Sequence, residues 1–225
     1  MYVFGKNVAN EVIRDVKKIK KAYISKNFDE RDIITVLNRN NINIKFMEKR
    51  DLDKFIDGNH QGIVLEIEDY KYSDIDELTE EKIVMLDHLE DPHNLGAIIR
   101  TCEAAGIKGI IIPKDRSVSV NSTVMKTSAG ALELVKIAMV TNLTQTIEYL
   151  KKKGYWIVGT DMQGTNYKEI DYNGKIVIVI GNEGKGISDI VRKNCDFIAS
   201  IPMKGSINSL NASVAAGIII FEATK

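Results

Sequence analysis

Short apolar runs alternate with helix-like periodic segments along the chain. In the first 70 residues, apolar runs at 21–25, 42–47 and 62–68 predict strands. The segments 7–16 and 29–40 have the spacing of amphipathic helices, so this part predicts a compact α/β unit. From residue 81 the alternation becomes regular. Six apolar runs predict strands there, at 82–89, 109–113, 135–140, 155–161, 175–181 and 195–202.

Helical patterns separate most of these later strands. They lie near 94–106, 122–130, 142–153 and 186–194, and a last one covers 208–223. Continuous β-branched runs such as IVIVI suit strands that are covered on both faces. The fold class is therefore α/β, with a mostly parallel sheet between two layers of helices. Such sheets bind ligands at the carboxyl ends of their strands.

An acidic stretch, EDYKYSDIDELTEE, separates the two parts of the chain. It has few large apolar side chains, which favours a linker. We expect a small N-terminal domain at 1–71, a linker at 72–80 and a larger domain at 81–225.

Composition narrows the class of protein. The 225 residues are 44% hydrophobic and 28% charged, as in soluble globular proteins. No apolar run approaches the roughly 20 residues that span a bilayer, and the first residues lack a signal-peptide pattern. We expect a cytoplasmic protein with no membrane partner. Cys102 and Cys195 fit reduced thiols better than a disulfide.

Net charge is zero, but it is unevenly distributed. Residues 1–50 carry 12 Lys/Arg and 6 Asp/Glu, whereas residues 51–80 carry 2 and 10. Residues 81–225 are nearly balanced, with 17 and 15. The basic first segment favours a surface that faces a polyanion, although a solvated lysine-rich helix face would give the same count.

Three polar clusters follow predicted strands. In EDPHNLGAIIRTCEAAG, Asn94 stands where a helix cap belongs, and Arg100 lies off the apolar stripe. Gly96 costs about 1 kcal/mol in a helix, which suggests that something approaches the backbone there. A capped helix with a solvated arginine explains this cluster about as well as a functional site does.

The second cluster, IGNEGKGIS, is a glycine-rich loop whose amides can face a ligand. It matches neither the dinucleotide fingerprint nor the P-loop, which disfavours a nucleotide-dependent oxidoreductase. The third cluster, from Ser206 to Ser213, leads into a helix that is apolar nearly all round. Because buried polar groups need partners, we expect these side chains to contact other loops or a ligand. His88 and His93 match no common zinc spacing, so we expect no metal.

Taken together, NLGAIIRT, IGNEGKGI and IPMKGSINSLNASVA resemble the three signature motifs of the SpoU (TrmH-type) branch of SPOUT RNA 2′-O-ribose methyltransferases. The N-terminal part resembles the small domain, similar to ribosomal protein L30e, of the RlmB-like subgroup. The resemblance implies an S-adenosylmethionine-dependent enzyme that methylates a guanosine ribose of 23S rRNA. It also implies a C-terminal trefoil knot and a homodimer. The same chemistry on tRNA or on an rRNA antibiotic-resistance site, and a non-catalytic RNA-binding relative, remain alternatives.

By the same resemblance, the motif positions acquire roles. The cofactor-binding residues would be Gly181, Asn182, Glu183, Gly184, Ile201, Met203, Ser209, Leu210 and Asn211. Thr160 is added to this set from its position alone, because VGTDMQG ends another predicted strand with Thr160 and Asp161 and would border the same crevice. The catalytic residues would be Asn94, Arg100, Glu183, Ser209 and Asn211. An arginine keeps its proton, so Arg100 would bind a phosphate or stabilise negative charge on oxygen. An RNA phosphate, water or Glu183 would then take the proton of the ribose hydroxyl.

Overall fold

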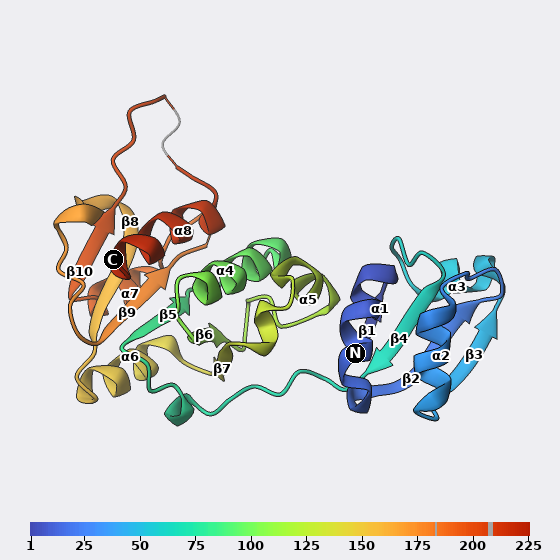
Figure 1. Cartoon of the computed structure of the whole chain (residues 1–225). Coiled ribbons are helices and arrows are strands. Elements are labelled where there is room, and N and C mark those ends of the chain that lie inside the picture. Colours follow the sequence, from blue (N-terminus) through green and yellow to red (C-terminus); the bar gives the residue numbers. More distant parts are fainter. Residues whose placement is uncertain (183, 207–208) are drawn as a thin grey trace. The chain divides into compact units, whose positions relative to one another are not determined.

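The computed structural model describes residues 1–182, 184–206 and 209–225. The chain divides into two compact units, Met1–Lys71 and Tyr72–Lys225, which we call unit 1 and unit 2 (Figure 1).

Unit 1 contains a four-stranded sheet in the order β1-β4-β2-β3. β2 and β3 are parallel, and β4 runs antiparallel to β1 and β2. Its strands are β1 (Tyr2–Phe4), β2 (Ile19–Ser25), β3 (Asn43–Met47) and β4 (Ile63–Ile67). Its helices are α1 (Lys6–Val12), the 3-10 helix η1 (Ile13–Lys18), α2 (Arg31–Arg39) and α3 (Lys49–Phe55).

The three strands and two helices predicted in this unit are confirmed, and two elements were missed. β1 has only three residues, too few for a periodic pattern. α3 is charged at most positions and buries only Leu52, so it has no apolar stripe.

Unit 2 contains a six-stranded sheet in the order β10-β8-β9-β5-β6-β7, and each neighbouring pair is parallel. The predicted mostly parallel α/β sheet is confirmed. Its strands are β5 (Lys82–Leu86), β6 (Gly109–Pro113), β7 (Lys136–Val140), β8 (Trp156–Asn166), β9 (Ile176–Ile180) and β10 (Phe197–Ser200). Its α-helices are α4 (Pro92–Ala104), α5 (Ser122–Ser128), α6 (Leu143–Lys152), α7 (Asp189–Asn194) and α8 (Ala212–Ala223). Short 3-10 helices lie at η2 (Ile75–Glu77), η3 (Ala131–Glu133) and η4 (Tyr167–Glu169).

The strand order positions the site. From β5 the chain proceeds outward through β6 and β7, and then returns to build β8, β9 and β10 on the other side. The order therefore reverses beside β5, the kind of point at which open parallel sheets bind ligands. α6 and α7 bury Leu150 and Val191 against one face of the sheet. α4 and α8 lie side by side away from α6 (Figure 1).

The segment expected to be a linker is attached to unit 2. The Tyr72 hydroxyl accepts a hydrogen bond from the Val120 amide at 2.9 Å, and the Ser73 amide donates to the Ile137 carbonyl at 2.9 Å. The Asp76 carboxylate accepts hydrogen bonds from Tyr149 and Lys153 of α6. Residues 72–76 are thus held to the sheet and helices of unit 2.

The start of α4 differs from the prediction. Asp91 is the N-cap, because its carboxylate accepts a hydrogen bond from the His93 amide at 2.8 Å. Asn94 is instead buried in the first turn. Gly96 faces α5: a Cβ built there would lie 2.6 Å from the Thr127 Cβ. The close approach inferred from this glycine is therefore made by a neighbouring helix.

Candidate active site

A cavity of about 800 Å³ lies at the carboxyl ends of β8, β9 and β10, closed on one side by α8. Its apolar lining includes Ile180, Ala215 and Ile219, and its polar lining includes Asn166 and Ser200. Cavities of this size hold small organic ligands. The mixture of apolar surface and convergent polar groups suits a ligand that has both apolar and polar parts.

The glycine-rich loop after β9 forms one wall of the cavity. Asn182 and Gly186 exchange two backbone hydrogen bonds of 3.0 and 2.9 Å, so the loop folds back as a tight bridge. Gly186 has a φ of 67°, which favours glycine. A Cβ on Gly181 would lie 2.2 Å from the Gly186 carbonyl carbon. Gly181 is therefore required by the loop's own backbone.

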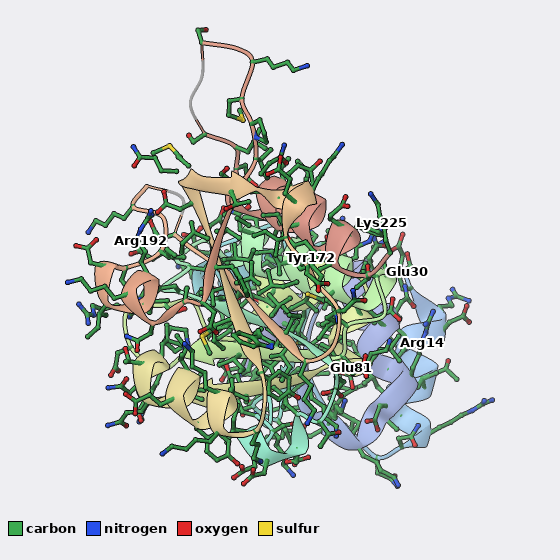
Figure 2. The ribbon with its side chains drawn as sticks, turned by 90° about the vertical axis from the view of Figure 1, so that its left-hand side faces the viewer. Arg14, Glu30, Glu81, Tyr172, Arg192 and Lys225 are labelled. Atoms are coloured by element: carbon green, nitrogen blue, oxygen red, sulfur yellow. The ribbon has the colours of Figure 1, made fainter. Side chains whose placement is uncertain are left out.

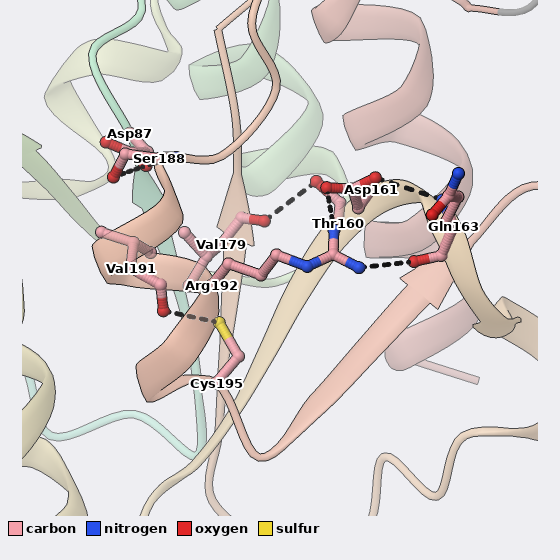
Figure 3. Close-up of polar contacts among 9 residues, drawn as sticks. All are labelled: Asp87, Thr160, Asp161, Gln163, Val179, Ser188, Val191, Arg192 and Cys195. Carbon is pink, nitrogen blue, oxygen red and sulfur yellow. Dashed lines mark hydrogen bonds and ion pairs between the residues drawn. The ribbon is translucent and has the colours of Figure 1, made fainter.

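A buried carboxylate anchors this loop to the end of β5. Asp87 is 1% exposed. One of its oxygens accepts hydrogen bonds from the amide and the hydroxyl of Ser188, at 2.6 and 2.8 Å (Figure 3). The other accepts one from His88 Nδ1 at 2.5 Å. The Asn182 amide group donates to the His88 carbonyl at 2.9 Å, so both ends of the loop are tied to Asp87 and His88.

The end of β8 forms the opposite wall. Arg192 of α7 pairs with Asp161 and donates to the Gln163 carbonyl at 3.2 Å (Figure 3). The Thr160 hydroxyl donates to the Val179 carbonyl at 3.0 Å, which ties β8 to β9. β8 continues five residues beyond the predicted end at Asp161. Met162, Gln163, Gly164 and Asn166 line the cavity as well, although none of them was among the predicted cofactor-binding residues.

The structure brings most of the predicted cofactor-binding residues together. Those that line the cavity are Thr160, Gly181, Asn182, Gly184, Ile201, Met203, Ser209 and Leu210. Asn211 caps α8 instead, accepting hydrogen bonds from the Ser213 amide at 2.9 Å and hydroxyl at 2.6 Å. Glu183 lies outside the described residues. Of the other predicted catalytic residues, Asn94 and Arg100 do not line the cavity, and Arg100 is exposed on α4.

The burial expected for the polar groups before α8 is not found at three of the described residues, and Asn208 lies outside the described residues. Ser206, Ser209 and Asn211 are exposed. The described residues 202–206 are also exposed, and the cavity that Ser209 borders is open to solvent. Water can therefore satisfy these polar groups.

The structure gives little support for a catalytic thiol or for a metal site. Burial raises the pKa of the Cys195 thiol to about 11 and raises that of Cys102 further. Neither thiol is a ready nucleophile at neutral pH. Among the described residues, no three His, Cys, Asp or Glu side chains gather to hold a metal ion.

No helix within the described ranges is long and apolar enough to cross a membrane.

Comparison with known families assigns both units. The profile of the SpoU rRNA Methylase family matches residues 81–221. This chain belongs to the SpoU methylase family. A second profile, RNA 2′-O ribose methyltransferase substrate binding, matches residues 2–73. The predicted resemblance is confirmed, and the chain is an RNA methyltransferase that uses S-adenosylmethionine.

Individual relatives agree with this assignment. YacO of Bacillus subtilis, assigned to the TrmH family of tRNA/rRNA methyltransferases, is 41% identical over 98% of this chain and 94% of its own length. The SpoU methyltransferase AviRb from Streptomyces viridochromogenes, solved with AdoMet, has a TM-score of 0.79 at 25% identity, covering 100% of this chain and 89% of that one. The A. aeolicus TrmH/SpoU tRNA modifying enzyme has a TM-score of 0.59 at 34% identity, covering 65% and 75%.

Proposed function

We propose that this SpoU methyltransferase methylates the ribose 2′-hydroxyl of a guanosine in 23S rRNA. The observation that carries the proposal is the cavity at the ends of β8, β9 and β10, which gathers eight predicted cofactor positions from three separate segments of the chain. Its fit to S-adenosylmethionine follows from the apolar side chains of Ile180 and Leu210 beside the polar groups of Asn182 and Ser209.

The bound cofactor supplies an already activated methyl group, so the chain's main task is alignment. The loop 181–188, held by Asp87, fixes one wall, and the β8 extension, held by Arg192, fixes the other. Walls held by such contacts would orient the methyl donor with little reorganisation during the reaction. Ser209 borders the cavity and is exposed, so its hydroxyl is available to a substrate as well as to the cofactor.

Arg100 is proposed to act on the RNA. It is exposed on α4, outside the cavity of its own chain. A guanidinium stays protonated and presents a planar fork of donors, which suits a phosphate or a developing oxyanion. Glu183, an RNA phosphate or water remains the proposed acceptor of the ribose proton.

Unit 1 is proposed to present the RNA. Its first 50 residues carry the excess of basic side chains, and Arg14, Lys17 and Lys20 are exposed. Figure 2 shows Arg14 extending away from the ribbon of this unit. Contacts of Lys and Arg with phosphate supply affinity that weakens as salt rises.

A homodimer and a trefoil knot are part of the same proposal. Val214 and Phe221 of α8 are 51% and 52% exposed, and such apolar side chains on one helix support a subunit contact. A sedimentation measurement of the full chain tests the dimer. A single species with the mass of one chain would contradict it.

The reaction is tested with tritiated S-adenosylmethionine and unmodified 23S rRNA or tRNA, followed by nuclease mapping of 2′-O-methyl sites. We expect label at one guanosine ribose of 23S rRNA, and its absence with the Arg100→Ala variant. Label only in tRNA would favour the second candidate, for which the tRNA modifying relative from A. aeolicus gives a precedent. Label on a base would contradict the ribose chemistry.

A further inference from the structure

Unit 1 carries a second cavity, of about 420 Å³, which we call the loop pocket. Four segments build it: the start of α1, the loop between β2 and α2, α3, and residues 58–62 before β4. None of the predicted site residues lies here. All of its lining comes from unit 1, so it is separate from the cofactor cavity of unit 2.

A buried histidine fixes the wall at 58–62. His60 is 3% exposed, and its Nδ1 accepts a hydrogen bond from the Gly62 amide at 3.0 Å. Nε2 therefore carries the ring proton and donates it to Asp53 Oδ1 at 2.7 Å. The Asp53 side chain is still 55% exposed, so the carboxylate remains accessible from the pocket.

The same wall adopts an unusual backbone. Gln61 has a φ of 51° and Gly62 one of 88°. The Gln61 side-chain oxygen accepts a hydrogen bond from the Lys6 amide at 2.8 Å, which ties this wall to the start of α1. A non-glycine residue in the left-handed region costs free energy, and surrounding contacts must hold it in place. The pocket is thus prearranged in one geometry.

The side chains of the pocket balance in charge. Its lining contains the ammonium groups of Lys6 and Lys49 and the carboxylates of Asp29 and Asp53. The Lys6 ammonium is already occupied, at 2.9 Å from Asp29 Oδ1 and 2.8 Å from Glu30 Oε1. A free phosphate would find little excess positive charge here. A ligand of this pocket must therefore be recognised through groups that are polar but uncharged.

The remaining lining matches an unstacked nucleobase. Phe28 supplies an aromatic surface, while Asn27 and Asn59 supply amide donors and acceptors. Proteins that read single-stranded RNA stack bases on aromatic side chains and hydrogen-bond their edges. The accessible carboxylate of Asp53 selects among bases, because guanine alone presents two adjacent N–H donors on its pairing edge, which one carboxylate can accept together.

We propose that the loop pocket binds an unpaired guanine of the RNA substrate, with Asp53 accepting from its pairing edge. The inference rests on the proposed function, since it assumes an RNA substrate. In unit 1, exposed lysines would then bind the phosphates without regard to sequence, and the loop pocket would supply the base preference.

The test uses the full-length protein and fluorescent RNA hexamers, namely a uridine hexamer and three variants with a single central guanosine, adenosine or cytidine. Anisotropy gives each affinity. We expect the guanosine hexamer to bind at least about fivefold more tightly than the others, because a bidentate base contact is worth about 1–3 kcal/mol. Asp53→Asn keeps an oxygen for His60 but replaces an acceptor by a donor, so it should abolish the preference. Phe28→Ala should weaken binding of all four hexamers.

Lys45→Ala is the matched control, because Lys45 is exposed on β3 and does not line the pocket. It should leave the guanosine preference intact. Equal binding of the four hexamers, a preference for another base, or a preference that survives Asp53→Asn would overturn the inference. Cofactor affinity and methyl transfer to 23S rRNA are measured on the same preparations. If the wild-type protein methylates 23S rRNA but shows no guanosine preference, the loop-pocket inference alone is rejected. If it shows neither methyl transfer nor guanosine preference, the proposed function is rejected as well.

Discussion

Asp87 offers a direct test of how the cofactor loop is held. Replacing Asp87 by alanine removes the acceptor of the two Ser188 hydrogen bonds, of 2.6 and 2.8 Å, and of the His88 contact. Hydrogen bonds to a charged group contribute about 1.5–3 kcal/mol each. The two Ser188 bonds therefore represent about 3–6 kcal/mol of anchoring. Without them, the described part of the loop is held mainly by the Asn182 contacts, and ligand binding must supply the missing order.

The consequence is a loss of cofactor affinity. If about 3 kcal/mol of anchoring is lost, the competent loop becomes a minor state and the apparent Kd rises by up to about 100-fold. Asp87→Asn should lose less, because its amide oxygen can still accept from Ser188 and its NH₂ can donate to a neutral His88 ring. Ser188→Ala removes one of the two bonds and should fall between wild type and Asp87→Ala.

Isothermal titration of the four proteins with S-adenosylmethionine measures these differences, and near-UV circular dichroism checks the fold. The double variant Asp87→Ala/Ser188→Ala should be less impaired than the sum of the single effects by about 1 kcal/mol or more, since the two residues share one interaction. A folded Asp87→Ala protein with wild-type affinity would refute the anchoring argument. Strictly additive effects would refute the assigned pairing.

Three further predictions test other contacts. Gly96→Ala gains about 1 kcal/mol of helix propensity but meets the Thr127 Cβ at 2.6 Å, an overlap that costs about 1–3 kcal/mol. A Cβ on Gly217 would lie 3.8 Å from the Thr101 Cγ2, an ordinary contact. Urea unfolding should therefore find the Gly217→Ala protein more stable than the Gly96→Ala protein, and the reverse order would contradict the α4–α5 packing. Gly181→Val should displace the loop backbone and weaken cofactor binding by at least about tenfold in calorimetry, and unchanged affinity would count against the loop's role. Arg100→Ala should lower turnover while keeping cofactor affinity, with Arg100→Lys recovering part of it; normal turnover in the alanine variant would make Arg100 a solvated surface residue.

The alternation of apolar runs was enough to predict the sheet of unit 2. Strands such as IVIVI at β9 are buried on both faces, so every position carries the signal. The same reasoning failed where burial is partial. The end of β8 is exposed from Met162 to Thr165 and pairs with β10 only after a register shift. Its sequence, MQGTN, therefore carries no strand pattern, although it lines the cavity.

Side-chain roles were harder to predict than elements. Asn94 and Asp91 are both good capping residues, and which one caps depends on where Pro92 starts the helix. The role of Asp87 could not be predicted, because its partner Ser188 lies 101 positions away. No local pattern encodes a contact of that separation. The motif resemblance, by contrast, identified cavity positions from two separate segments together, the loop after β9 and the segment before α8.

The polar residues before α8 show how one motif serves several physical needs. Asn211 satisfies the first amides of α8 and also accepts from the Ser213 hydroxyl, which accounts for both of these polar side chains. Ser209 borders the cavity and Ser206 is exposed. The cap gives α8 a fixed start, and Ala215 and Ile219 then face the cavity from its next turns. The helix is apolar because one side of it lines the cavity and another packs on α4. Val214 and Phe221 remain exposed on it. Its polar start is needed because the same segment must begin the helix, border the cavity and remain in water.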